Sequence, residues 1–189
     1  WEVIDAAKTK PYGFMAFYPG PGIGGHCIPL DPFYLEWKAK EYDFHTSLIQ
    51  TSGRINDQMP EYVVDNVMKL LNKEKKAMNG AKVLLMGVAY KNDIDDMRES
   101  PALKVIEHLE KNGANVMICD PYIPEFEHKG KKYFTVDWKE VVGESDIVVI
   151  TTSHSSIDYE ELAEKAKLIY DTRNATKEVK NNREKIYKL

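Results

Sequence analysis

The chain has 189 residues, of which 43% are hydrophobic and 30% charged, and its formal net charge is −4. These values predict a folded, soluble protein of one to one and a half ordinary domains, and the acidic balance argues against a nucleic-acid partner. Two cysteines provide no disulfide framework, which fits a reducing cytoplasm, and no apolar run reaches the ~20 residues that a membrane-spanning helix needs.

The chain begins in what is predicted to be the end of a helix. Residues 1–8 have a helical composition, and Pro11 follows, which disfavours helix in the residue before it. Because this pattern starts at Trp1 as if inside a helix, we expect the chain to be part of a longer protein. Residues 11–32 are dense in proline and glycine and are predicted to be a loop.

Two helices are predicted after this loop. The first covers about 33–41, with Asp31 as its N-cap. We expect three of its side chains to be partly buried: Phe33, Leu35 and Trp37. The second covers about 45–76, because apolar residues recur at every fourth position there. Pro60 lies inside this stretch and is expected to kink it or to start a separate helix.

From Gly80 onwards, short apolar runs alternate with helical patterns, which predicts parallel strands joined by helices. The predicted strands are 83–86, 115–119, 134–136, 147–151 and 167–170. The predicted helices are 100–112, 138–142 and one that follows Asp158. The fold class is therefore α/β, with a helical segment over 1–78 followed by a Rossmann-like doubly wound parallel sheet over 79–189. The basic tail 177–188 is predicted to be a solvated face.

Residues 20–32 read GPGIGGHCIPLDP and carry the strongest chemical signal in the chain. Four glycines allow the backbone to approach a ligand closely. Cys27 follows them, where a turn can present its thiol to a substrate, and the carboxylate of Asp31 can hold a water nearby. This layout is typical of covalent catalysis through a thiolate. A plain turn with a buried cysteine is the simpler alternative.

The segment GGHCIPLDPFYLEWKA resembles the active-site signature of the nucleotide-sugar 6-dehydrogenases, in which GG-x-C-x-P-x-D carries the nucleophile. His26 precedes the cysteine, and Leu30 stands where UDP-glucose dehydrogenases usually have a lysine. Both features resemble the branch that acts on UDP-N-acetylhexosamines. The upstream TKPYGFMAFYPGPG is more similar to UDP-N-acetylglucosamine 6-dehydrogenases than to the UDP-N-acetylmannosamine enzymes.

This resemblance to the UDP-glucose/GDP-mannose dehydrogenase family covers essentially the whole chain. It implies an NAD-dependent enzyme of polysaccharide biosynthesis whose N-terminal NAD domain is absent here. It also implies a UDP-sugar substrate held by the C-terminal Rossmann-like domain, and a homodimer formed through the central helix.

The resemblance implies specific roles for individual residues. Cys27 would be the nucleophile and Asp31 would place the water that hydrolyses the thioester. The implied substrate-binding residues are Gly22, Gly24, Gly25, Tyr90, Lys91 and Arg173. Tyr90 would pack on the uracil, Lys91 would bond the substrate, and Arg98 would reach towards NAD. In the implied reaction the sugar C6 loses two hydrides, passing through an aldehyde, a thiohemiacetal and a thioester to the uronate.

The turn after the first predicted strand lacks the dinucleotide fingerprint. It reads Gly87-Val88-Ala89-Tyr90-Lys91, with one glycine where pyrophosphate binding needs several. We therefore expect this half not to bind NAD in the usual way. A lysine at the carboxyl end of a strand suits a phosphate or a sugar, because ligands collect outside those ends.

Simpler structural roles compete with several of these assignments. Arg98 could form a surface pair with Asp95 or Asp96, and Arg173 could neutralise Asp171. Asp120, before a proline, is more typical of a turn, Cys119 is expected to be buried and inert, and no metal site is expected because no histidines stand at metal-ligand spacing.

Other functions also remain open. The chain could be a non-catalytic UDP-sugar-binding module, or an unrelated cysteine hydrolase, which would need a separate base to orient its thiol. Within the dehydrogenase interpretation, UDP-N-acetylmannosamine or UDP-glucose could replace UDP-N-acetylglucosamine as the substrate.

Overall fold

The computed structural model describes residues 1–189 and is built on a parallel sheet of five strands in the order β2-β1-β5-β6-β7. The strands are β1 Lys82–Met86, β2 Asn115–Cys119, β5 Ile147–Ile150, β6 Ile169–Asp171 and β7 Ile186–Lys188. A separate antiparallel hairpin consists of β3 Glu125–His128 and β4 Lys131–Phe134. The strand order reverses between β1 and β5, which is where open α/β sheets bind their ligands.

Helices cover both faces of the sheet, which confirms the predicted doubly wound α/β fold. The covering helices are α3 Ser47–Lys73, α4 Pro101–Lys111, α5 Trp138–Val141 and α6 Tyr159–Lys165. The remaining helices, α1 Glu2–Ala7 and α2 Asp31–Lys40, lie away from the sheet, and a 3₁₀ turn covers Arg183–Lys185. Val83 and Leu85 of β1 face α3 and α4, whereas Leu84 and Met86 face α5 and α6. Because both faces are covered, the central strands are apolar at almost every position. No helix is both long and apolar enough to span a membrane.

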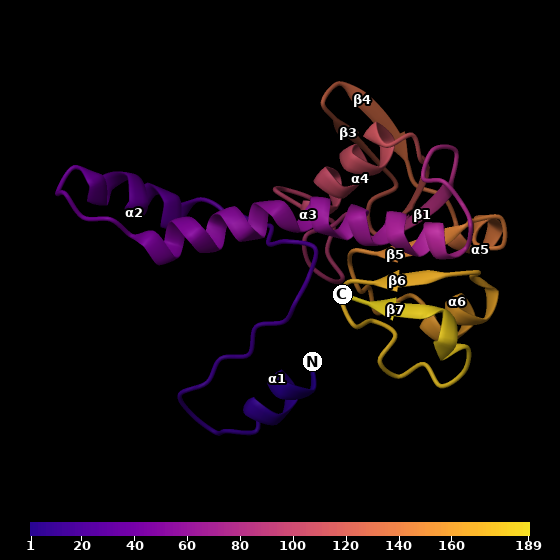
Figure 1. Cartoon of the computed structure of the whole chain (residues 1–189), viewed down its shortest axis with the longest axis horizontal. Helices are drawn as coiled ribbons and strands as arrows, with labels where there is room; N and C mark the ends of the chain where they lie inside the picture. The colour runs from indigo at the N-terminus through magenta and orange to yellow at the C-terminus, as the bar shows by residue number, and fades with distance from the viewer.

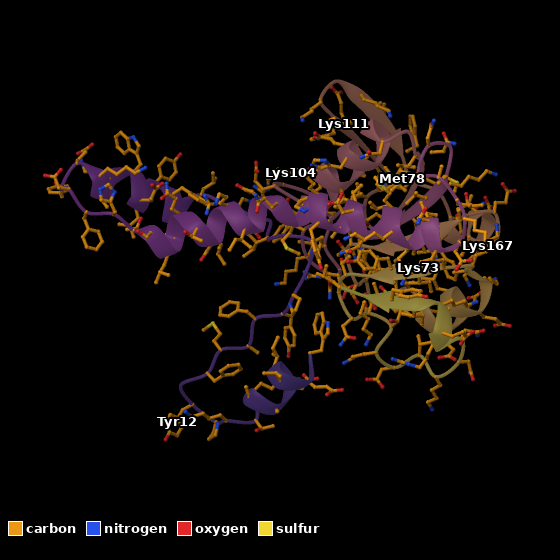
Figure 2. The ribbon with its side chains drawn as sticks, viewed as in Figure 1. Tyr12, Lys73, Met78, Lys104, Lys111 and Lys167 are labelled. Atoms are coloured by element: carbon orange, nitrogen blue, oxygen red, sulfur yellow. The ribbon has the colours of Figure 1, made fainter.

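Helix α3 joins the sheet to a projecting arm. Its C-terminal half buries Val63, Val67 and Leu71 against the sheet. Its N-terminal half extends away from the sheet and has α2 beside its far end, while α1 sits apart at the end of an extended segment (Figure 1). Figure 2 shows the Tyr12 side chain projecting from that segment, where it is 76% exposed. The N-terminal third of the chain therefore contributes little to the core.

The long helix departs from its prediction in two ways. It is one helix from Ser47 to Lys73, so Pro60 does not start a second one. The apolar stripe is buried only from Pro60 onwards, and Ile55 is 55% exposed. The reason is geometric, because the sheet lies beside the C-terminal half of the helix, whereas the N-terminal half is contacted mainly by the short α2 and by the loop that precedes it.

Helix α2 also differs from expectation. It begins at Asp31, which is its first helical residue and makes no capping hydrogen bond. Phe33 packs on α3, where a Cβ added to Gly53 would lie 2.2 Å from its ring. Leu35 and Trp37 are 58% and 64% exposed, so their predicted partial burial is wrong. Most of each of these two side chains is therefore left uncovered by the rest of the chain.

Two C-terminal features were missed by sequence. The predicted strand 134–136 is wrong, because the strand pairing lies earlier, in the β3-β4 hairpin. The tail 177–188 is not merely a solvated face, since β7 adds a parallel edge strand to β6. The sequence pattern for strand β7 was weak, because Ile186 and Tyr187 are flanked by charged residues. In the structure their side chains pack on opposite faces of the sheet.

We expect Leu71→Ala to destabilise the chain by about 2–5 kcal/mol, because it opens a cavity in the fully buried contact between α3 and the sheet. The control is Val3→Ala on α1, a side chain that is 81% exposed, which we expect to change stability by about 0.5 kcal/mol or less. Urea unfolding followed by circular dichroism gives both values. Equal effects of the two substitutions would contradict the assignment of the core.

Candidate active site

The glycine-rich loop packs directly on the sheet domain. A Cβ on Gly24 would lie 2.6 Å from the Cβ of Tyr90, and one on Gly25 would lie 2.9 Å from the Tyr90 ring. The amide of Gly25 donates to the carbonyl oxygen of Arg98 at 3.2 Å. Glycine is therefore required here because the loop backbone lies against the segment that follows β1.

Two further glycines extend this contact. A Cβ on Gly22 would lie 2.9 Å from the Cβ of Pro101, at the start of α4, and Gly22 has φ +133°. A Cβ on Gly20 would lie 2.5 Å from a guanidinium nitrogen of Arg173. Of the predicted substrate-binding residues, Gly24 and Gly25 are thus brought together with Tyr90, and Arg173 lies against the start of the same loop.

Asn56 on α3 holds the middle of the loop and was missed by sequence. Its side-chain oxygen accepts a hydrogen bond from the amide of Ile23 at 2.8 Å. No local sequence pattern identifies Asn56 as a loop contact, because it lies on a helix 33 residues from Ile23. The loop is therefore fixed between the central helix and the sheet domain.

Cys27 lies just before α2 with an exposed side chain. Its carbonyl oxygen accepts hydrogen bonds from the amides of Leu30 and Asp31, at 3.1 and 2.8 Å. The Asp31 side chain is exposed and makes no hydrogen bond or ion pair. The thiol of Cys27 and the carboxylate of Asp31 are therefore both free of side-chain partners, and the two residues lie four positions apart in the sequence.

A polar cluster surrounds Tyr90 beside the loop. The guanidinium of Arg98 donates to both carboxylate oxygens of Asp96, at 2.7 to 3.1 Å, and this lowers the pKa of Asp96 to about 2. The ring of His26 meets the ring of Tyr90 edge-on, with 6.3 Å between the two centroids, and the His26 Nε2 lies 3.9 Å from the Asp96 carboxylate. The surface pair considered for Arg98 therefore does form, with Asp96.

Lys91 and Arg173 are cations without carboxylate partners. Lys91 is exposed and forms no ion pair. The guanidinium of Arg173 is half-buried and also unpaired, and burial lowers its pKa although Asp171 opposes this. Asp171 does not take it as a partner, since its oxygens accept hydrogen bonds from the Arg173 and Ala175 amides and from Thr176.

The turn after β1 is closed by a buried carboxylate. Asp120, at the end of β2, accepts hydrogen bonds from the amides of Val88 and Ala89 at 2.7 and 3.1 Å. Burial alone would raise the pKa of Asp120, but hydrogen bonds from His154 and from these amides hold it below its ordinary value. The two amides that a pyrophosphate would need are thus already taken, and α4 begins only at Pro101. The turn after β1 therefore does not fit the pyrophosphate of a dinucleotide.

The second cysteine is buried, as predicted. Burial raises the pKa of Cys119 to about 11, so it is a thiol at neutral pH and not a nucleophile. No group of three or more acidic, histidine or cysteine side chains gathers at metal-binding distance.

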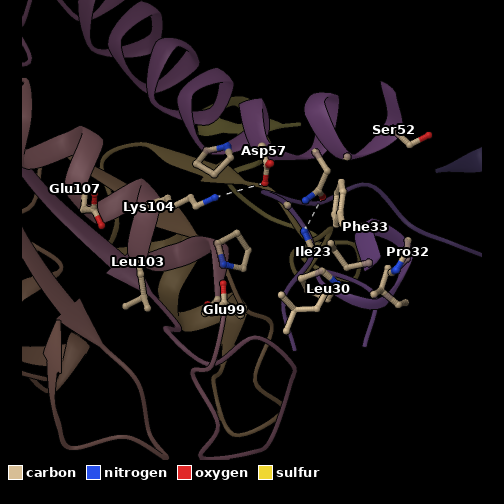
Figure 3. A pocket seen from close by; sticks show the side chains of 18 of the residues that line it. Ile23, Leu30, Pro32, Phe33, Ser52, Asp57, Glu99, Leu103, Lys104 and Glu107 are labelled. Carbon is tan, nitrogen blue, oxygen red and sulfur yellow. Dashed lines mark hydrogen bonds and ion pairs between the residues drawn. The ribbon is translucent and has the colours of Figure 1, made fainter. Parts of the chain in front are cut away.

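A groove of about 1090 Å³ lies between the loop, α3 and α4 (Figure 3). Its walls are tied by the Asn56–Ile23 hydrogen bond and by the ion pair of Lys104 with Asp57 at 3.5 Å. Of the predicted site residues only Gly22 lines it. The groove is therefore separate from the cluster around Tyr90.

Comparison with known proteins identifies the family. The family model described as UDP-glucose/GDP-mannose dehydrogenase family, UDP binding domain, matches residues 84–178, and that for the central domain matches residues 1–58. The chain belongs to this family. Its UDP-binding region contains Tyr90, Lys91 and Arg173, and its central region contains the loop with Cys27.

Similar proteins are nucleotide-sugar dehydrogenases. The chain is 36% identical over 182 residues to a UDP-N-acetyl-D-mannosamine dehydrogenase of Methanocaldococcus jannaschii, covering 92% of this chain and 39% of that protein. It is 33% identical over 153 residues to a UDP-N-acetyl-D-glucosamine 6-dehydrogenase of Pseudomonas aeruginosa, covering 81% and 36%. The solved UDP-D-ManNAc dehydrogenase of Pyrococcus horikoshii matches with a TM-score of 0.79 and 33% identity, over 95% of this chain and 41% of that one. The chain thus spans about 40% of the length of these relatives.

We expect Gly24→Ala to displace the loop, because the added methyl group would overlap Tyr90 and the carbonyl oxygen of Glu99 at 2.9 Å. Overpacking of this kind costs about 1–3 kcal/mol, which corresponds to a rise in local opening of roughly five- to 150-fold. Hydrogen–deuterium exchange of peptides covering residues 20–31 measures it. Gly143→Ala is the control, since nothing lies within 4 Å of its added Cβ. Unchanged exchange in the Gly24 variant would contradict the packing described.

Proposed function

We propose that the chain is the nucleotide-sugar-binding and nucleophile-bearing part of an NAD-dependent UDP-N-acetylhexosamine 6-dehydrogenase. The observation that carries the proposal is the seating of the Cys27 loop on the sheet domain, through glycines that allow no side chain. It brings a free thiol and an aromatic ring, Tyr90, to the same edge of the sheet. That edge is the carboxyl end of the strands, next to the reversal of strand order.

In this proposal the nucleotide binds at that edge. Tyr90 offers a ring for the uracil, and Lys91 and Arg173 offer charge-assisted hydrogen bonds to the diphosphate or the sugar. The absence of carboxylate partners supports this role, because neither cation would have to break an ion pair to bind a ligand. Gly22, Gly24 and Gly25 keep the loop backbone close to the same region.

The covalent chemistry is assigned to Cys27. Its thiolate would add to the aldehyde carbon at C6 of the sugar, forming a C–S bond and a thiohemiacetal. After the second oxidation that carbon would be a thioester, and a water placed by Asp31 would add to it and release the thiolate with the uronate. A thiolate is a good leaving group, so the last step needs no protonation of sulfur.

NAD would supply hydride acceptance for both oxidations. The turn closed by Asp120 does not fit it, so we assign its binding to a domain outside this chain. Arg98 is proposed to approach the cofactor from this side, and its pairing with Asp96 would hold the guanidinium in place.

UDP-N-acetylglucosamine is the proposed substrate, because the Cys27 loop and the segment before it resemble those of UDP-N-acetylglucosamine 6-dehydrogenases. UDP-N-acetylmannosamine is the second candidate, because several similar proteins are dehydrogenases of that sugar. Both carry an acetamide, and a pocket built for it would leave polar groups unpaired with UDP-glucose. Comparison of kcat/KM for the three sugars by the full-length enzyme discriminates among them.

We also propose a homodimer formed through the central helix, with residues 1–78 as the central part and 79–189 as the UDP-sugar domain. Exposed apolar side chains on α2 and α3 support a partner surface there: Tyr34, Leu35, Trp37, Leu48, Ile55 and Tyr62. The alternative of a cysteine hydrolase has no support, because no histidine hydrogen-bonds the Cys27 thiol. A non-catalytic module would bind the UDP-sugar without needing Cys27.

We expect Lys91→Ala and Arg173→Ala each to weaken UDP-sugar binding about ten- to a hundredfold, since a charge-assisted hydrogen bond contributes ~1.5–3 kcal/mol. Isothermal titration calorimetry with UDP-N-acetylglucosamine measures the affinity. Lys69→Ala, an exposed lysine on α3, is the control and should bind like the wild type. Unchanged affinity in both test variants would mean that the site is elsewhere.

In the full-length enzyme, we expect Cys27→Ala to abolish uronate formation while UDP-sugar affinity stays within about threefold. Cys27→Ser should stall after the covalent stage, because an oxygen ester hydrolyses more slowly than a thioester. Cys119→Ala serves as the control, because that thiol is buried and un-ionised. Full turnover by the Cys27→Ala variant would refute the nucleophile role and leave the non-catalytic module.

A further inference from the structure

His154 is a buried histidine that the proposed chemistry does not use. It follows β5 in the loop 151–158 and is 1% exposed. Its Nε2 lies 3.2 Å from the Asp120 carboxylate, and its Nδ1 lies 3.0 Å from the backbone nitrogen of Asp93. These partners could not be predicted from sequence, because Asp93 lies in the loop after β1 and Asp120 follows β2.

The partners of the ring determine its tautomer. A backbone amide can only donate, so Nδ1 must accept from Asp93 and carries no proton. The proton therefore lies on Nε2 and is donated to Asp120. The imidazole is a neutral bridge with a defined donor side and a defined acceptor side.

The bridge holds one particular loop. Asp93 has φ +61°, a left-handed conformation that a non-glycine residue keeps only when its surroundings hold it. Its carboxylate accepts hydrogen bonds from the Ser155 amide at 2.8 Å and from the Tyr122 hydroxyl at 3.2 Å. The preceding residue, Asn92, accepts from the Ser153 amide at 3.2 Å. The loop after β1 is thus fastened to the loop after β5, with His154 in the middle.

Lys91 comes immediately before these two anchored residues and has no contact of its own that fixes it. We propose that His154 is a positioning residue, which places Lys91 for the UDP-sugar by accepting the Asp93 amide. This rests on the binding role proposed above for Lys91. His154 does not touch the ligand and acts only through the backbone of residues 91–93.

The two sides of the imidazole can be tested separately. In His154→Asn the side-chain oxygen can take the place of Nδ1 and accept from Asp93. In His154→Gln the side-chain amide can take the place of Nε2 and donate to Asp120, but the Asp93 amide loses its acceptor. We expect the Asn variant to bind UDP-N-acetylglucosamine within about threefold of wild type, and the Gln variant to bind roughly five- to tenfold more weakly, the scale of one hydrogen bond.

A double-substitution cycle distinguishes positioning from general stability. If His154 acts through Lys91, His154→Gln should have no further effect on affinity in a Lys91→Ala background, whereas a general loss of folded protein would add to it. Melting temperatures of all variants are measured alongside. Hydrogen–deuterium exchange over residues 88–99 should rise in the Gln variant and not in the Asn variant.

The outcomes separate this inference from the proposed function. If the wild-type chain binds no UDP-N-acetylglucosamine or UDP, the proposed function fails and this role for His154 falls with it. If the wild type binds but the Gln variant binds equally well, or its effect is fully additive with Lys91→Ala, only the positioning role is overturned. If the Asn variant is as weak as the Gln variant, the Asp93 contact is not what matters and the inference is again wrong.

Discussion

The carboxylate of Asp120 is the interaction on which the proposed ligand-binding edge of the sheet depends. It lies buried where β1, β2 and β5 end, and it accepts hydrogen bonds from two amides of the turn after β1, from the Tyr122 amide and from His154. A buried charge is tolerated only when its lone pairs are fully used, as they are here. Removing it would leave several donors unpaired at once in the loop that carries Tyr90 and Lys91.

This constraint explains how a Rossmann-like sheet departs from dinucleotide binding. In the usual arrangement the first turn leaves its amides free and leads directly into a helix, so that pyrophosphate meets the helix N-terminus. Here an internal carboxylate takes the place of the phosphate, and a long loop separates β1 from α4. This loop carries Tyr90, Lys91 and Arg98 at the carboxyl edge of the sheet, beside the glycine loop that carries Cys27.

Much of the sheet domain could be predicted from sequence, because its strands are buried on both faces and its helices carry clear caps. The side chains of Ser100 and Asp158 cap α4 and α6, at the starts of two predicted helices. The hairpin, β7 and the exposure of Leu35 and Trp37 could not be predicted, since they depend on which surfaces meet in three dimensions. The same holds for Asn56 and His154, whose partners are 33 and 61 residues away along the chain.

The most direct test of the account compares NAD with UDP as ligands of this chain by calorimetry under identical conditions. If Asp120 occupies the amides that a pyrophosphate would use, and Tyr90, Lys91 and Arg173 form a nucleotide site, UDP should bind with measurable heat and NAD should give none at the same concentrations. Tight binding of NAD without binding of UDP would contradict the account.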